Sequence, residues 1–331
     1  MVIPLYNHEK YIEDALKSVF EQKAKPSEII VIDDGSTDGS AATMKKLCAT
    51  HPEIAFWSQP NRGAHRTINA GISHATGEFV AVLNSDDTYH PERLMQCLKI
   101  FERDPTVAAV TTGVAFIDDH GDGIRNAWYE QARCFYDEIQ DLALALINAN
   151  FFMTTSNLMV RRSVFGEVGL FSALRYTHDL DFFLRLLVHQ KPVYFLDMPL
   201  VNYRIHPSNT IRQSQFKLKL EWACIAAFFL FNMLKQENRH RMNWAYLKKY
   251  LGIMVRHTLI SLMIYFLACF ARSKTTPLRS NTFFNPNHAG IDTRAGCQGL
   301  TDHLGRFEEY FAPRNGTRPE HSVGRESVDN G

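Results

Sequence analysis

Two apolar segments that end in pairs of acidic residues carry the side chains best suited to chemistry. Each run, residues 29–32 and residues 79–83, predicts a strand buried on both faces. In an open α/β sheet, ligands bind beyond the carboxyl ends of the strands, so acids that follow both runs would surround one crevice. Adjacent carboxylates repel one another unless a cation or hydrogen-bond donors hold them, which favours a divalent metal ion and a nucleotide as ligands. The four acids are Asp33, Asp34, Asp86 and Asp87.

Alternating strands and helices would place these acids at one edge of a sheet. Before about residue 115, apolar periodicity predicts an amphipathic helix over 9–22, a second helix from Ser36 to about Ala49, and a strand over 107–112. Pro91 stands where a first-turn proline opens a further helix. This repeated order indicates the α/β class, with a mostly parallel, Rossmann-like sheet flanked by helices.

The next hundred residues give a weaker signal. Residues 116–150 show little periodicity beyond a turn near Asp118. After them we expect a strand over 158–160, a helix over 179–189 and a strand over 193–196, with a turn at Pro199.

Composition excludes several classes of protein. With 45% apolar residues among 331, the chain can bury a sizeable core, and its formal charge of +1 gives no electrostatic reason to bind nucleic acid. Six cysteines without a CxxC pair argue against zinc and disulfide frameworks and favour reduced thiols in a cytosolic setting. No signal peptide is expected. Met1 runs directly into a strand-like segment, which leaves two alternatives open: a natural start a few residues upstream, or a short first strand.

The character of the chain changes after residue 212. Residues 213–271 are rich in Phe, Leu, Ile and Met and predict an apolar helical region that follows the domain 1–212. The longest apolar run, 258–271, is shorter than the roughly 18–20 residues that span a bilayer. A packed or oligomeric helix pair, a helix lying on the membrane, and a true span stay open as alternatives, in that order. Residues 272–331 lose periodicity and predict a disordered tail.

Several motifs in this order resemble family 2 glycosyltransferases, which are inverting enzymes with the GT-A fold. The resemblance covers roughly residues 1–210. The motifs are Val2-Ile3-Pro4-Leu5-Tyr6-Asn7, Asp33-Asp34-Gly35-Ser36-Thr37-Asp38, Asn61-Arg62-Gly63, Asn69-Ala70-Gly71, Ser85-Asp86-Asp87, His178-Asp179-Leu180-Asp181 and Tyr203-Arg204-Ile205-His206.

The sequence departs from the family pattern at two positions. The metal motif of the family is commonly Asp-x-Asp, whereas Asn84 here supplies an uncharged amide. The acidic pair before the substrate helix is often Glu-Asp, and here it is His178-Asp179. Both changes bear on the affinity for metal and on the pKa of the base.

The resemblance implies roles for the acids. Asp33 and Asp34 would contact the nucleoside, although a turn that caps the next helix would also use them. Asp86 and Asp87 would hold Mn²⁺ or Mg²⁺ and the diphosphate, against the alternative of a solvated loop. Asp179 would be the general base, with Asp181 as its substitute, although Asp is also a common N-cap.

Other residues in the motifs have less specific roles. Pro4, Asn7 and Asn84 would line the nucleotide. Arg62 and Arg204 would contact phosphate or base, or else pair within the protein, and His206 would be a metal or phosphate ligand or a structural histidine before a proline.

The resemblance therefore implies a metal-dependent glycosyltransferase. It would move a sugar from a nucleotide sugar, with a UDP-sugar favoured, to a carbohydrate or lipid-linked hydroxyl acceptor in cell-surface polysaccharide, lipopolysaccharide or glycolipid synthesis. We expect a cytoplasmic protein, either free or at the inner face of the membrane, with no nucleic-acid partner, and a homo-oligomer is an open alternative. Two other readings are a catalytically weakened scaffold that binds nucleotide sugar and, ranked lower, a sugar nucleotidyltransferase. The nucleotidyltransferase alternative lacks support because the loop after the first strand is neither Gly-rich nor strongly basic.

Overall fold

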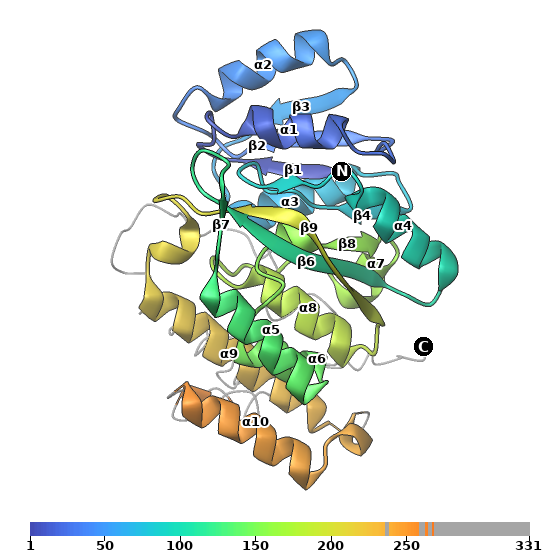
Figure 1. Cartoon of the computed structure of the whole chain (residues 1–331), viewed down its shortest axis with the longest axis vertical. Coiled ribbons are helices and arrows are strands. Elements are labelled where there is room, and N and C mark those ends of the chain that lie inside the picture. The colour runs from blue at the N-terminus through green and yellow to red at the C-terminus, as the bar shows by residue number, and fades with distance from the viewer. Residues whose placement is uncertain (236–237, 258–261, 264–266, 268–331) are drawn as a thin grey trace, which may run out of the picture.

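The computed structural model describes residues 1–235, 238–257, 262–263 and 267. The tail expected over 272–331 and most of the apolar run 258–271 lie outside these residues. Figure 1 shows the strands in the upper and middle parts of the molecule and the last described helices at its lower end.

Strands and helices alternate as far as residue 81, as the sequence predicts, and follow a less regular order after it. The strands are β1 (Val2–Leu5), β2 (Ile29–Asp33), β3 (Ile54–Ser58), β4 (Phe79–Ala81), β5 (Thr88–Tyr89), β6 (Ala109–Ile117), β7 (Gly123–Ile124), β8 (Met159–Arg161) and β9 (Val193–Arg204). The helices are α1 (Ile12–Phe20), α2 (Ser40–Thr50), α3 (Ala64–His74), α4 (Arg93–Arg103), α5 (Ala127–Ile139), α6 (Leu142–Asn148), α7 (Val164–Val168), α8 (His178–Val188), α9 (Gln215–Met233) and α10 (Trp244–Arg256).

The first strands form the parallel part of the sheet. β1, β2 and β3 pair in that order and are all parallel, and a parallel bridge between Val2 and Val82 joins them to the segment that follows β4. All five residues of β2 are buried, as its apolar run predicts. The expected α/β class is therefore confirmed in this half of the fold.

The second sheet is mixed. Its order is β4-β8-β6-β9-β5, with β6 parallel to β9 and with β8 antiparallel to both β4 and β6. The turn expected at Pro199 is wrong, because β9 continues through this proline. The ladder between β6 and β9 shifts register on both sides of Gly113, where a Cβ would lie 2.9 Å from the backbone of Met198. A proline has no backbone N–H to donate to a regular ladder, and this irregularity allows Pro199 to lie within the strand.

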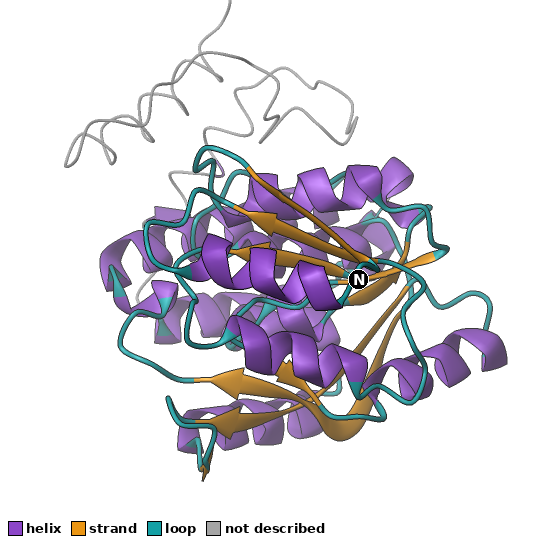
Figure 2. Ribbon diagram, turned by 90° about the horizontal axis from the view of Figure 1, so that it is seen from above, coloured by secondary structure: helices purple, strands orange, loops and turns teal. Residues whose placement is uncertain are grey.

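Helices cover both faces of the sheet (Figure 2). Successive residues of a strand point to opposite faces. Accordingly, Val2 and Ile30 belong to the hydrophobic cluster that α3 and α8 complete, and Ile3 and Val31 belong to the cluster that α1 and α4 complete. The two clusters hold the strand ends in place from opposite sides.

The last two described helices join the first of these clusters. α9 packs against α8, α10 packs against α6, and the buried Tyr250 hydroxyl donates a hydrogen bond to the carbonyl oxygen of Ala226. In Figure 1 they lie at the end of the molecule opposite β3 and α2. Among the described residues, no helix combines the length and apolar character that crossing a membrane requires.

Candidate functional site

The carboxyl ends of β1, β2, β4 and β9 meet at one edge of the sheet. β1 and β2 are parallel, and the amide of Leu83 donates to the carbonyl of Val2 at 3.0 Å, which continues this alignment beyond β4. The loops that leave these strands carry the acids predicted from the sequence, together with His8 and His206. The strand-end rule therefore places the polar side chains as expected.

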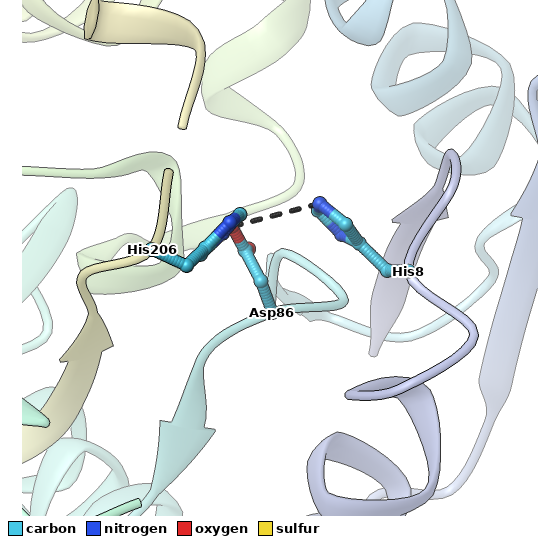
Figure 3. A group of neighbouring side chains, drawn as sticks. All are labelled: His8, Asp86 and His206. Atoms are coloured by element: carbon cyan, nitrogen blue, oxygen red, sulfur yellow. Dashed lines mark hydrogen bonds and ion pairs between the residues drawn. The ribbon is translucent and has the colours of Figure 1, made fainter. Parts of the chain in front are cut away.

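Three of these side chains form a compact cluster, His8, Asp86 and His206. Nε2 of His206 lies 3.0 Å from Oδ2 of Asp86, and Nε2 of His8 lies 3.8 Å from the same oxygen. One ligand atom of each residue lies within 4.8 Å of the others. Figure 3 shows the two imidazoles on either side of the carboxylate. Two imidazole nitrogens and a carboxylate oxygen are a donor set that suits a first-row divalent cation.

Neighbouring hydroxyls hold both imidazoles in this orientation. Nδ1 of His8 lies 2.8 Å from the Ser85 hydroxyl, and Nδ1 of His206 lies 2.8 Å from the Ser208 hydroxyl. Each ring thus leaves its Nε2 for Asp86, which is the arrangement of a histidine whose second nitrogen fixes it for a metal ion. Burial alone would raise the pKa of Asp86, but the two imidazoles lower it below its ordinary value. The acid is therefore ionised.

His8 is the site residue that the sequence analysis missed. It follows β1 by three residues, so the rule that selected Asp33 and Asp86 as strand-end residues would also have selected this histidine. A single histidine near the start of a chain carries no spacing signal of its own, so no motif in the sequence indicated a ligand role for His8.

Asp87, which the sequence pairs with Asp86, has a different environment. Its Oδ1 accepts from the amide of Arg204 at 3.0 Å, and its Oδ2 accepts from the hydroxyls of Ser156 at 2.6 Å and Thr154 at 3.2 Å. Burial and the adjacent Asp86 raise the pKa of Asp87 to about 8. The side chain is 1% exposed. It therefore ties the loop between β4 and β5 to β9 and to the segment before β8.

Asn84 belongs to the same network. Its Nδ2 donates to the Thr154 hydroxyl at 2.8 Å, and its backbone amide donates to Ser156. The amide side chain that departs from the family pattern is therefore used to anchor the loop that carries Asp86.

Arg204 is engaged within the protein. Its Nε donates to the carbonyl of Asp86 at 2.9 Å, its guanidinium pairs with Asp14 at 3.1 Å, and it lies over the ring of Tyr11. The residue is 2% exposed. Of the two interpretations of Arg204, the geometry favours pairing within the protein over contact with a phosphate.

The acids after β2 also accept hydrogen bonds from nearby backbone. Asp34 accepts from the amides of Arg62 at 2.9 Å and Gly63 at 2.8 Å, and from the side chain of Gln59 at 3.0 Å. Asp33 accepts from the amide of Ser36. Asp34 thus fixes the loop that presents the exposed side chain of Arg62.

Asn7 connects the two N-terminal loops. Its Oδ1 accepts from the amide of Thr37 at 2.7 Å, and its own amide donates to Ser36. Its φ of 53° lies in the left-handed region, which Asn tolerates better than most residues. Pro4 lies within β1, opposite Ile32 of β2.

Asp179 lies at the start of α8, on a different side of the site. It is 7% exposed, and its Oδ2 accepts from Nδ2 of Asn150 at 2.9 Å. Burial raises the pKa of Asp179 above its ordinary value, although His178 acts in the opposite direction. A carboxylate with a raised pKa and one fixed oxygen is suited to accept a proton.

Asp181 is a structural residue in this arrangement. Its carboxylate forms a buried ion pair with Arg185 at 2.8 Å and accepts from the hydroxyl of Ser172, and the residue is 2% exposed. Removing this pair would leave an uncompensated buried charge. The geometry therefore argues against Asp181 as a substitute base.

Tyr203 connects the two ends of the site electrostatically. Burial, followed by the carboxylates of Asp87, Asp86 and Asp179, raises the pKa of its phenol above the ordinary value. All three acids therefore act on the same phenol.

Known proteins resemble this chain in sequence. The family model described as Glycosyl transferase family 2 matches residues 1–169. An uncharacterized glycosyltransferase of Rickettsia typhi is 29% identical over 240 residues, covering 72% of this chain and 73% of the relative. A chondroitin synthase of Pasteurella multocida is 32% identical over 186 residues, covering 56% of this chain and 18% of that protein.

Solved structures share the fold. TarS of S. aureus, in complex with UDP-GlcNAc, has a TM-score of 0.53 at 16% identity and covers 88% of this chain and 99% of that one. The mannosyltransferase PcManGT of Pyrobaculum calidifontis, in complex with GDP-Man and Mn²⁺, has a TM-score of 0.51 at 19% identity. The match covers 83% of this chain and 75% of that one. These likenesses confirm the GT-A architecture that the sequence predicts.

Proposed function

The chain belongs to glycosyl transferase family 2, and on that premise we propose that it transfers a sugar from a nucleotide sugar to a hydroxyl acceptor. UDP-sugars are the favoured donors, and a carbohydrate or lipid-linked molecule of a cell-surface pathway is the acceptor. Support comes from TarS, solved with UDP-GlcNAc, and from PcManGT, solved with GDP-Man and Mn²⁺. The observation in this chain that carries the proposal is the meeting of His8, Asp86 and His206 beyond the carboxyl ends of three strands.

The cluster fits a divalent cation. Asp86 would supply an oxygen ligand, His206 and His8 would supply nitrogen ligands, and Asp87 orders the loop that carries Asp86. Mg²⁺ prefers oxygen ligands, whereas Mn²⁺ accepts both oxygen and imidazole, so the donor set favours Mn²⁺ of the two ions expected from the sequence. When bound, such an ion neutralises the charge that develops on the leaving nucleoside diphosphate.

Asp179 is the proposed general base. It accepts the proton of the acceptor hydroxyl while that oxygen attacks the anomeric carbon, and the bond from this carbon to the diphosphate breaks on the opposite side. A single displacement inverts the configuration at the anomeric carbon. Asn150 fixes Oδ2 of the base by its hydrogen bond, so the second carboxylate oxygen can face the acceptor.

The nucleotide would lie against the loops that follow β1, β2 and β4. Arg62 and Asn7 carry the exposed side chains of this set. Asp34 acts by holding the loop of Arg62, and Asp33 by holding the turn at Ser36. The proposed nucleotide-binding residues are Pro4, Asn7, Asp33, Asp34, Arg62 and Asn84.

We propose that residues 1–212 form the catalytic unit and that residues 213–271 attach it to the inner face of the cell membrane. Trp244 is 75% exposed on α10, and Val255, Lys248 and Lys249 are also exposed there, with no acidic residue on this helix. Exposed aromatic and basic side chains favour an anionic lipid surface. Binding to anionic vesicles that weakens with salt would support this contact. A dimer in sedimentation, without vesicle binding, would favour a second copy on this face.

A panel of UDP-, GDP- and dTDP-sugars tests the proposed activity. With Mn²⁺ present, we expect wild-type protein to bind one of these donors and to hydrolyse it slowly, and to lose both properties in EDTA. Asp86→Ala should lose Mn²⁺ binding, measured by electron paramagnetic resonance, together with turnover. The matched control is Glu102→Ala, which removes an exposed carboxylate on α4. Metal-independent turnover would contradict the role of the cluster, and binding of none of the sugars would contradict the activity itself.

A further inference from the structure

Three buried polar atoms have no hydrogen-bond partner in the part of the chain that the structure describes, and their residues contact Asp179, adjoin it, or are linked to it through α3 and Phe171. They are Nε2 of His65, Oδ1 of Asn150 and Nδ1 of His178. They account for three of the eight such atoms among the described residues. A buried polar atom without a partner costs free energy, so three of them at one place require an explanation.

Specific contacts bring these atoms together. His178 precedes Asp179 in α8, and Asn150 donates to Asp179 through its other amide atom. His65 lies on α3, one turn before Asn69 and on the same face. Asn69 accepts from the amide of Phe171 at 2.9 Å and donates to its carbonyl at 2.8 Å, so it fastens α3 to the segment that leads into α8.

The ring of Phe171 then places His178. The two rings meet edge to face with their centres 6.0 Å apart, and Nε2 of His178 lies 3.2 Å from the Thr155 hydroxyl. One nitrogen of His178 is thus used within the protein, while the other is left without a partner. The two nitrogens of His178 therefore have different environments.

The chemistry of these atoms suits an uncharged ligand. Burial, followed by the charges of His178 and Arg66, lowers the pKa of His65 to about 3, so this imidazole is neutral at physiological pH. Its Nε2 can donate or accept according to the tautomer, and Oδ1 of Asn150 can only accept. A phosphate or carboxylate would need cationic or donor groups, whereas a hydroxyl both donates and accepts and matches this set.

Building on the proposed function, we propose that His65, Asn150 and His178 form a subsite that binds the hydroxyl groups of a sugar ring beside Asp179. The ring belongs either to the donor or to the acceptor, because both meet at the base during transfer. The substitution of His178 for the Glu that is common in the family would then be part of the recognition of the sugar.

Substituting the two histidines by asparagine or glutamine distinguishes a role in binding sugar from a purely structural role. An asparagine amide can place a polar atom near the Nδ1 position of a histidine, and a glutamine amide can place one near the Nε2 position. His178→Asn therefore keeps the subsite atom and loses the bond to Thr155, while His178→Gln does the reverse. At position 65, His65→Gln keeps the subsite atom and His65→Asn loses it, because Nε2 is the atom without a partner there. His51→Asn and His51→Gln are the controls, since His51 lies before β3, at the opposite edge of the sheet, and contacts Glu53.

Two measurements test the subsite. The first follows the imidazole ¹⁵N resonances of the wild-type protein during titration with the methyl glycosides of glucose, galactose and N-acetylglucosamine, and with the donor found in the panel above. The second compares hydrolysis of that donor in water with transfer to the same methyl glycosides. We expect His178→Gln and His65→Asn to lose about tenfold in kcat/KM, and His178→Asn and His65→Gln to lose only about threefold.

The pattern of losses assigns the sugar. A loss in both hydrolysis and transfer places the donor sugar in the subsite, and a loss in transfer alone places the acceptor sugar there. The subsite is overturned if none of the sugars shifts the imidazole resonances, or if His178→Gln is the milder change at that position. If the wild-type protein fails to bind UDP with Mn²⁺, the proposed function fails, and the glycoside titration still decides the subsite.

Discussion

The carboxylates that follow β2 and β4 accept hydrogen bonds from several donors, whereas around Asp179 three buried polar atoms lack a partner among the described residues. Asp34 accepts three hydrogen bonds and Asp87 accepts another three. The first region is thus held rigid by internal bonds before any ligand arrives. The second region contains Asp179, the proposed base, and its neighbouring polar atoms lack hydrogen-bond partners among the described residues.

This difference teaches that an acidic motif does not make every acid a ligand. Of Asp86 and Asp87, the first meets two imidazoles and the second is closed off by three donors. A preorganised scaffold of this kind reduces the cost of ordering the site when the substrate binds. The polar atoms near Asp179 suit the opposite task, which is recognition.

The largest effect is expected at the base. Asp179→Asn should lower transfer by roughly 10²–10⁴-fold, because the amide cannot accept the proton, while binding of nucleotide with Mn²⁺ stays unchanged. Because burial raises the pKa of Asp179, activity in the wild type should fall, as the pH is lowered, at a higher pH than for an ordinary Asp. Single-turnover transfer across pH measures both. Wild-type turnover in this variant would remove Asp179 from the mechanism.

A smaller effect, on stability, is expected at the other region. Asp34→Asn replaces one accepting oxygen by a donor that faces backbone amides, and should lower the free energy of unfolding by about 1–3 kcal/mol. Denaturant unfolding measures this, with the exposed Asp122→Asn as the matched control. An unchanged stability combined with weaker nucleotide binding would mean that Asp34 contacts the nucleotide directly. The comparison between the two regions would then need revision.

Much of the fold could be predicted because its signals are local. The apolar runs before Asp33 and Asp86 form buried strands, and the periodicity over 179–189 corresponds to α8. Three helices were missed: α5 and α6, because the segment 116–150 carries little regular periodicity, and α7, which has only five residues. β3 was missed as well, since only one of its five residues is buried.

The sequence by itself determined most of the strands and helices before residue 115, and it determined that acids would follow two buried strands, since apolar periodicity and the strand-end rule depend only on neighbouring residues. The tertiary structure decided which of those acids remains available. Asp86 meets His206 across 120 positions of the chain, and Asp87 meets the amide of Arg204 across 117. Hydrogen bonds of such separation follow from how the sheet and helices pack, and no local pattern encodes them.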